Sequence, residues 1–296
     1  MTHLLSLLLN GLSLGAIYAL IALGFVIIFK ASEVVTFMQG SLLLLGAYLI
    51  ARFHEPLGFW GAVALGVGGT ALAAVLVERV LIDRLRGAPV ISLAILTIGA
   101  DLIILTELTR RIGSDILTVG HPWGGDSLAV GGVGITTNRA LAIAVAAALI
   151  GAFFLAFKYS SWGVAMRAAA EDAEAAALMG IRLGRVSMLA WLAAGVLAAV
   201  AGLFAVGSPT PGVTPAVWAV ALAAIPAAVL GGLDSTGGAL VGGLVIGVTE
   251  ALAAGYQDQI AFLGRGFGEV VPYVVMVAVL LVRPSGLFGT REVTRV

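Results

Sequence analysis

Long uninterrupted runs of apolar residues constrain the fold of this chain more than any other feature. The first run, residues 4–29, is long enough as a helix to cross a hydrocarbon layer of about 30 Å. Hydrophobic residues make up 60% of the chain and its mean hydropathy is +1.11, so most segments must lie in lipid or against other apolar segments. A soluble globular fold is excluded, and the sequence predicts an all-α, polytopic integral membrane protein.

The chain divides into about eight or nine predicted transmembrane helices, some short or broken, in one transmembrane domain that covers residues 1–296. Residues 36–50 are few for a full crossing, and short or broken helices are typical of transport cores. Residues 216–230 and 239–254 flank a glycine-rich turn; they form either two spans joined by a cytoplasmic turn or two half-helices that meet within the membrane. The predicted segments are 4–29, 36–50, 58–80, 90–108, 139–157, 186–206, 216–230, 239–254 and 270–282.

Several classes of function are excluded by residue types that are absent or few. The formal net charge of zero argues against nucleic acid as a partner, and the lack of cysteine excludes a thiolate metal site and a thiol nucleophile. The three histidines lie near predicted span ends, so neither a histidine metal cluster nor a Ser-His-Asp triad is expected. Because no phosphate-binding GxxxxGK[ST] motif is present either, we expect no catalytic residue, no metal and no cofactor bound by this chain.

The first apolar run is predicted to be a permanent span rather than a cleaved signal. Its start lacks a positively charged region, and Lys30 follows the run instead, which places the N-terminus outside. Gly11 and Gly15 form a GxxxG pattern within this span. The pattern predicts close packing against another helix, with a polar lining of a pathway as the alternative.

Three polar side chains within predicted spans are candidates for lining a transport pathway, because polar groups are costly in lipid and normally face protein or a wet cavity. Gln39 either lines the pathway or caps the start of a helix. Asp101 either faces a hydrated cavity or pairs with another polar group, unless the span boundary is misplaced. Glu250 lies near a span end, where it lines the pathway or caps and snorkels.

The stretch of residues 110–138 is predicted to lie outside the membrane, because glycine, aspartate, threonine, proline and tryptophan fill it. Short alternating runs at 128–130 and 133–135 predict extended or hairpin structure on the outer face. Trp123 is either an interfacial anchor or part of a surface for a partner protein.

A polar, alanine-rich loop at residues 158–185 stands between two apolar spans and carries an unusual share of the charged residues. Asp172 is placed to cap a short helix, and Gly180 is placed where a left-handed residue ends one. Such a short helix is not stable alone in water, so it must dock on something. A helix lying on the membrane surface is the alternative, but it would need bulky apolar anchors where this segment has mostly alanine. The residues expected to contact a partner are Glu171, Asp172, Ala175, Ala176, Leu178, Met179 and Gly180.

This loop resembles the cytoplasmic coupling loop of permease subunits from ABC importers of the branched-chain amino acid type. The likeness is carried by RAAAED at 167–172, by AAALMGI at 175–181 and by the apolar span that opens at Arg185. The run FMQGSLLLLGAY at 37–48 is also similar to the family. The glycine turn that begins at 231 is family-like too, although Asp234 departs from the commonest pattern.

The resemblance implies a permease that translocates branched-chain amino acids, or a related small polar solute such as an amide or urea, by alternating access. Its implied partners are the membrane, a second permease subunit that is identical or homologous, two ATP-binding subunits that hold ATP and Mg²⁺, and an extracytoplasmic solute-binding protein. The short helix would insert into a cleft on the ATP-hydrolysing subunit. The alternative is an ion-coupled secondary transporter in which Asp101 and Glu250 form a proton or sodium site.

Lysine and arginine are distributed unequally between the two sides of the predicted topology. With nine segments and the N-terminus outside, eleven of the 16 fall on the inner side, as the positive-inside rule requires. This places the coupling loop and the C-terminus in the cytoplasm of a prokaryotic cell, with the chain in its inner membrane. The inner set is Lys30, Arg79, Arg84, Arg86, Lys158, Arg167, Arg182, Arg185, Arg283, Arg291 and Arg295, and the outer set is Arg52, Arg110, Arg111, Arg139 and Arg265.

Overall fold

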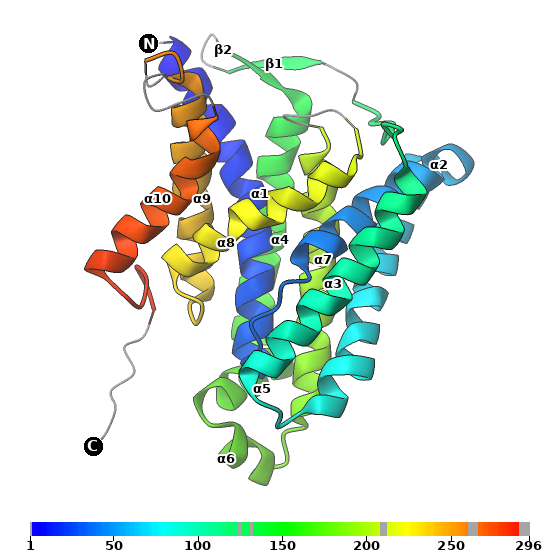
Figure 1. Cartoon of the computed structure of the whole chain (residues 1–296), viewed down its shortest axis with the longest axis vertical. Coiled ribbons are helices and arrows are strands. Elements are labelled where there is room, and N and C mark those ends of the chain that lie inside the picture. Colours follow the sequence, from blue (N-terminus) through cyan, green and yellow to red (C-terminus); the bar gives the residue numbers. More distant parts are fainter. Residues whose placement is uncertain (1, 124–125, 131–132, 208–211, 260–265, 290–296) are drawn as a thin grey trace.

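The computed structural model describes residues 2–123, 126–130, 133–207, 212–259 and 266–289, and they form a helical bundle with one short strand hairpin at its upper end (Figure 1). The all-α polytopic prediction is confirmed. The elements are α1 (Thr2–Ser32), α2 (Gln39–Val77), α3 (Val90–Ile112), β1 (Ser127–Val130), β2 (Val133–Thr136), α4 (Thr137–Tyr159), α5 (Ser161–Glu171), α6 (Ala173–Leu178), α7 (Leu183–Ala205), α8 (Ala219–Gly231), α9 (Thr236–Gly255) and α10 (Phe267–Val282).

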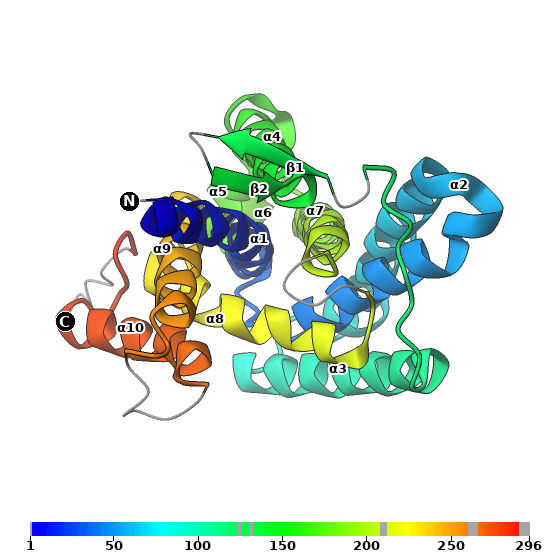
Figure 2. The same cartoon turned by 90° about the horizontal axis from the view of Figure 1, so that it is seen from above.

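Helix α1 lies at the centre of the bundle, between α7 and α9 (Figure 2). Residues 16–27 of α1 are all buried. Because α1 is apolar on every side it has no polar face to turn toward water, and a central position follows. Helices α3 and α10 instead expose large apolar side chains such as Ile103 and Leu281, which suits a surface that faces lipid or another membrane subunit.

The contact between α1 and α9 is made by small residues. A methyl group added at Gly11 would lie 2.7 Å from the Cα atom of Val248, and one added at Gly15 would lie 2.9 Å from the Cα atom of Leu244. Only glycine allows the two backbones to approach this closely. The GxxxG pattern therefore marks close helix packing, as predicted.

We expect Gly15→Leu to destabilise the protein strongly, because the new side chain meets the backbone of α9 and the two helices must separate. Overpacking of this kind costs about 1–3 kcal/mol or more. The matched control is Gly99→Leu on α3, where an added Cβ meets nothing within 4 Å. Thermal unfolding in detergent should show a lower midpoint for the first variant only; equal midpoints would contradict the packing described here.

Helix α2 is two helical halves that meet at a break. Gly58 there has φ of +69° and ψ of 166°, and Pro56 lies just before it. The first half begins at Gln39, within the bundle, after an extended segment that returns from the end of α1 (Figure 1). The expected second segment thus begins three residues later than predicted and continues past residue 50 to the break.

The described residues contain nine apolar helical segments when this break is counted. Six helices are long and apolar enough to cross a membrane, and one of them, Gln39–Leu85, contains both halves of α2. Two shorter apolar helices, Pro215–Gly231 and Phe267–Val282, complete the set. The number agrees with the eight or nine expected. Pro209 and Pro211, in the segment after α7, lie outside the described residues.

Helices α8 and α9 pack against each other, and the turn between them lies near the end of α1 that carries Lys30. Lys30, near the end of α1, donates a hydrogen bond of 3.0 Å from Nζ to the carbonyl oxygen of Asp234 in that turn. At the far end of α9, Gly255 lies against Leu7 near the start of α1. Helix α9 therefore runs alongside most of α1, whereas α8 crosses the bundle obliquely (Figures 1 and 2).

The carbonyl end of α8 is capped by the segment that follows α10. The Leu287 N–H donates to the carbonyl oxygen of Leu230 at 2.8 Å, and the Phe288 N–H donates to that of Gly231 at 3.1 Å. These are carbonyls that a helix end leaves without partners in its own helix. The segment after α10 therefore lies beside the same turn as Lys30.

Strands β1 and β2 form an antiparallel hairpin with Ser127 opposite Thr136, which confirms the extended structure predicted there. The hairpin lies at the end of the bundle opposite to α5 and α6 (Figure 1). Trp123, in the loop before it, packs edge-on against Phe59 of α2 with ring centroids 5.2 Å apart. The loop is thus held to the upper part of α2.

Candidate functional site

Two short helices, α5 and α6, project from the lower end of the bundle and contain the predicted coupling residues (Figure 1). Asp172 caps α6 by accepting a hydrogen bond of 2.9 Å from the Ala175 N–H, and Gly180 has φ of +86°. Both features of the predicted helix are confirmed. Helix α5 was not predicted. Two local features mark its position. The Ser160 Oγ caps the helix by accepting a hydrogen bond from the Gly163 N–H, and Met166 and Ala169 form its buried face.

Helix α6 presents most of the predicted contact residues to the outside. Leu178 is 88% exposed and Met179 is 84% exposed. Glu171, Asp172, Ala175 and Gly180 are also exposed. Ala176 is the exception: it is 4% exposed and faces its own chain, so it supports α6 from behind instead of lying on the outer surface.

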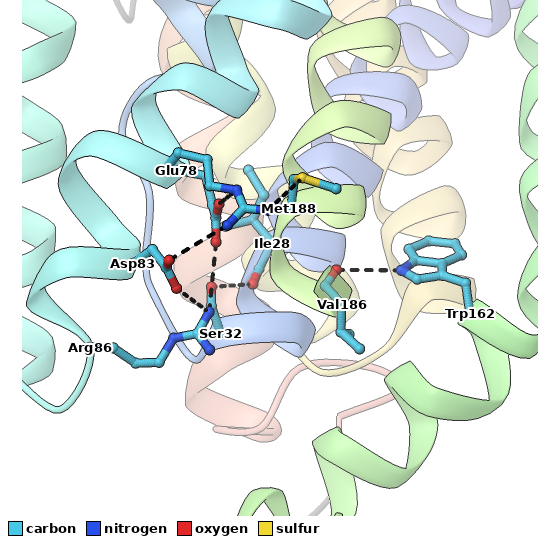
Figure 3. Close-up of polar contacts among 9 residues, drawn as sticks. Ile28, Ser32, Glu78, Asp83, Arg86, Trp162, Val186 and Met188 are labelled. Carbon is cyan, nitrogen blue, oxygen red and sulfur yellow. Dashed lines mark hydrogen bonds and ion pairs between the residues drawn. The ribbon is translucent and has the colours of Figure 1, made fainter. Parts of the chain in front are cut away.

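Helix α5 is fixed to the two spans on either side of it. Arg167 donates a hydrogen bond to the carbonyl oxygen of Phe157 at the end of α4, and its guanidinium lies 5.1 Å from the centroid of the Phe157 ring. Trp162 donates from Nε1 to the carbonyl oxygen of Val186 in the first turn of α7, at 3.3 Å (Figure 3). A displacement of α5 must therefore move the ends of both α4 and α7.

A cluster of charged side chains joins the lower end of α2 to α7 (Figure 3). Glu78 begins a π-helical segment, Glu78–Ile82, and its carboxylate is fully buried. Arg86 approaches Glu78 to 3.7 Å and Asp83 to 3.1 Å, while Arg79 donates to the Met188 sulfur on α7 at 3.4 Å. Arg79 and Arg86 were predicted only as cytoplasmic positive charges. The link from this cluster to α7 could not be foreseen, because Met188 is distant in sequence.

A cavity of about 310 Å³ lies between this cluster and the two short helices. Arg86 lines it on one side, Ala169 of α5 and Ala173 of α6 line it on another, and Lys30 and Ser187 complete the wall. The cavity therefore lies where α5 and α6 meet the bundle.

Two of the predicted pathway residues lie together at the start of α2. Gln39 is fully buried, and neither its amide nitrogen nor its amide oxygen has a hydrogen-bond partner in the part of the chain that the structure describes. Its side chain does not cap α2, since the N-cap residue is Met38 and no side-chain cap bond is formed. A Cβ added at Gly24 of α1 would lie 2.6 Å from the Gln39 amide nitrogen.

Asp101 of α3 holds the start of α2 in place. Its Oδ1 accepts a hydrogen bond of 3.0 Å from the Ser41 N–H, and its Oδ2 accepts one of 2.9 Å from Trp218 Nε1. The carboxylate is 3% exposed. The carboxylate therefore caps the N-terminal, partially positive end of α2, which starts inside the bundle. Of the alternatives considered for Asp101, this is the pairing with another polar group.

Glu250 lies apart from the other two, on α9. Tyr18 of α1 donates a hydrogen bond of 2.8 Å to its Oε2. Glu250 lines a cavity of about 370 Å³ together with Asn10, Ser13 and Arg139. The structure thus places the three predicted pathway residues at two separate positions, and it places Tyr18 and Arg139 near Glu250.

The described residues define a class of protein: a multi-pass helical membrane protein with cavities lined by apolar and a few polar side chains, and with a pair of short helices exposed at one end. These are the parts of a membrane transport component. Residues 7–280 match the family described as the permease component of branched-chain amino acid transport systems, and the chain belongs to that family. It is therefore a transport subunit, not an enzyme, and the family expected from the coupling loop is confirmed.

Curated relatives are similar over nearly the whole chain. The high-affinity branched-chain amino acid transport system permease protein LivH of Salmonella typhimurium is 33% identical over 97% of this chain and 96% of its own length. The corresponding protein BraD of Pseudomonas aeruginosa is 31% identical over 99% and 98%. A probable branched-chain amino acid transport permease protein of Methanocaldococcus jannaschii is 32% identical over 91% and 88%. No solved structure matches.

Proposed function

We propose that this chain is the permease subunit of an ATP-driven ABC importer that carries branched-chain amino acids, or a related small polar solute such as an amide or urea, by alternating access. Two ATP-binding subunits that hold ATP and Mg²⁺ would drive it. A second permease subunit, identical or homologous, and an extracytoplasmic solute-binding protein would complete the transporter. The family, and relatives named for branched-chain amino acid transport, support this assignment.

The observation that carries the proposal is the exposed tip of α6. Leu178 and Met179 are among the most exposed large apolar side chains, and they lie on a capped helix with a left-handed glycine at its end. Exposed apolar side chains of this size mark contact surfaces, and adjacent Glu171 and Glu174 disfavour contact with lipid. A cleft on a soluble partner is the environment that suits this tip.

The contacts of α5 give a path by which the partner would move the spans. A force on α6 passes to α5, then through Arg167 to the end of α4 and through Trp162 to the first turn of α7. Arg79 links that part of α7 to the end of α2. We infer that these contacts convert motion of the ATP-binding subunits into rearrangement of α2, α4 and α7.

The proposed orientation has the N-terminus outside and the C-terminus in the cytoplasm. Lys30 and Arg86 line one cavity with α5 and α6, so these inner-side charges gather at the end that carries the coupling residues. Lys30 also holds the turn beside which the segment after α10 lies. Arg265 of the outer set, and Arg291 and Arg295 of the inner set, lie outside the described residues.

A cysteine at position 178, introduced as Leu178→Cys, is expected to crosslink to a cysteine in the ATP-binding subunit within assembled membranes. The chain has no cysteine of its own, so the signal is specific. Gel mobility after mild oxidation measures the crosslinked fraction, and it should change when ATP is added because the interface moves.

The matched control is Leu85→Cys. Leu85 is 43% exposed and lies just before the turn into α3, next to the charged cluster. It should react with a soluble thiol reagent but should not crosslink. If Leu178→Cys stays fully reactive toward the reagent in the assembled transporter and forms no crosslink, α6 is not the docking element.

A further inference from the structure

A groove of about 310 Å³, the α7 groove, lies beside the start of α7, where α5 and the segment between α6 and α7 meet it. Helix α5 contributes Trp162 to its lining, and the other side is lined by Arg182, Arg185 and Leu189. The Trp162 indole is fixed in this place by its hydrogen bond to the carbonyl oxygen of Val186 (Figure 3). The groove is thus a built feature of the joint between α5 and α7.

The α7 groove lies at the level where two spans end. Helix α4 ends at Tyr159 and α7 begins at Leu183, and both helices are long and apolar enough to cross a membrane. Trp162 follows the end of α4, and Arg182 directly precedes α7. Tryptophan and arginine at span ends lie among the lipid headgroups, so the groove opens at headgroup level on the side of the coupling helices.

Two guanidinium groups give the α7 groove a positive charge. Arg182 and Arg185 are both exposed, and within the part of the chain that the structure describes neither side chain forms an ion pair or a hydrogen bond. The first turn of α7 contains no acidic residue. Arg86, at the same end of the bundle, is instead paired with Asp83. Two unpaired guanidinium forks in one groove match the oxygens of a phosphate group.

An exposed apolar stripe continues from the groove along α7. Leu189 lines the groove and Leu192 lies further along the helix, and both are exposed. Arg185, Leu189 and Leu192 are spaced by four and three residues, so they share one face of the helix. This face places an apolar surface at membrane depth directly beyond the two charges. A soluble anion would use only the charges, whereas a phospholipid would use both parts.

We propose that the α7 groove is a binding site for an anionic phospholipid of the leaflet on the side of the coupling helices. The phosphate oxygens accept hydrogen bonds from Arg182 and Arg185, the Trp162 ring packs against the glycerol region, and an acyl chain follows Leu189 and Leu192. The bound lipid holds α5 against the start of α7. This site is independent of the solute that the transporter carries.

The test is native mass spectrometry of the purified transporter titrated with phosphatidylglycerol or with phosphatidylcholine of the same acyl chains. Phosphatidylglycerol should bind more tightly, because phosphatidylcholine carries a compensating ammonium beside its phosphate. An arginine near an anionic lipid contributes about fivefold in affinity. Arg182→Gln and Arg185→Gln should therefore each weaken phosphatidylglycerol binding by about fivefold, and Arg182→Lys and Arg185→Lys should recover part of it.

Matched variants separate the groove from the rest of the surface. Arg84→Gln removes an exposed arginine at the same end that does not line the groove, and it should leave the affinity for phosphatidylglycerol unchanged. Leu192→Ser should weaken this binding, whereas Ile103→Ser, at an exposed position on α3, should not. All four positions are exposed, so the thermal unfolding midpoints should stay at the wild-type value.

Three results would overturn the inference. The first is equal affinity for the two lipids, or wild-type affinity for phosphatidylglycerol in both Arg182→Gln and Arg185→Gln. The second is displacement of the lipid by millimolar inorganic phosphate, which would assign the groove to a free anion. The third is lipid binding by the isolated permease that disappears on assembly with its partner subunits, which would show that a protein covers the groove. Each result leaves the importer assignment to be decided by uptake.

Discussion

Replacing Leu178 with aspartate is expected to abolish ATP-driven solute uptake while the permease remains inserted and folded. The side chain is 88% exposed, so the fold loses no packing, but a charge replaces the apolar group at the tip of α6. Loss of a central apolar anchor costs about 2 kcal/mol or more in binding, which corresponds to roughly 30-fold in affinity. Uptake into vesicles that contain ATP, together with retention of the ATP-binding subunits on the purified permease, measures the effect.

Ala175→Trp tests the same contact by shape instead of charge. Ala175 is exposed on α6, and a tryptophan there would overfill a close-fitting cleft. The matched control for both variants is Leu85→Asp, exposed but outside the coupling segment, which should keep uptake. Wild-type uptake by Leu178→Asp and by Ala175→Trp would show that energy does not enter through α6.

The same vesicles distinguish the importer from the ion-coupled alternative. Without ATP-binding subunits, an imposed proton or sodium gradient should drive no accumulation. Asp101, one of the two residues considered for an ion site, already accepts hydrogen bonds on both oxygens. Strong gradient-driven uptake would nevertheless establish a secondary transporter.

Asp101→Ala is expected to destabilise the protein by about 2 kcal/mol or more. The substitution leaves the Ser41 N–H and the Trp218 indole N–H without their acceptor, and each buried unsatisfied donor costs about 1–3 kcal/mol. It also removes the cap from a helix that begins inside the bundle. Thermal unfolding of the purified permease should show a clearly lower midpoint, and less folded protein should reach the membrane.

The unfolding midpoint of Asp101→Asn should lie between those of Asp101→Ala and the wild type, because the amide oxygen can still accept one of the two hydrogen bonds. Uptake per folded molecule should change little if the carboxylate only holds α2 in position. The control is Glu107→Gln on the same helix, whose carboxylate is exposed and pairs with Arg110 and Arg111 at the surface. An unchanged midpoint for Asp101→Ala would mean that the helix start is held in another way.

The spans could be predicted from the sequence because lipid imposes a minimum apolar length, and α1, α3, α4 and α7 follow that rule within a few residues. The cap at Asp172 and the turn at Gly180 could be predicted because they are local. The two halves of α2 were predicted as separate segments, but the first half extends further than expected, because the helix continues through Arg52, His54 and Glu55 as far as Gly58, where φ is positive.

Contacts between distant segments could not be predicted. Helix α5 depends on Arg167 and Trp162 reaching the ends of α4 and α7, so its stability comes from tertiary packing rather than from its own sequence. Ala176 carries the same residue type as Ala175, and only the docking of α6 decides which of the two faces the bundle. The pairing of Arg139 with Asn10 joins positions that no local pattern connects.

The capping of α8 by the segment after α10 makes the order of synthesis matter. The carbonyls of Leu230 and Gly231 receive their hydrogen bonds from residues translated only after α9 and α10 have been made. The end of α8 therefore acquires these partners only after α10 and the residues that follow it have been made. Until then its last carbonyls must be satisfied by water or remain unpaired.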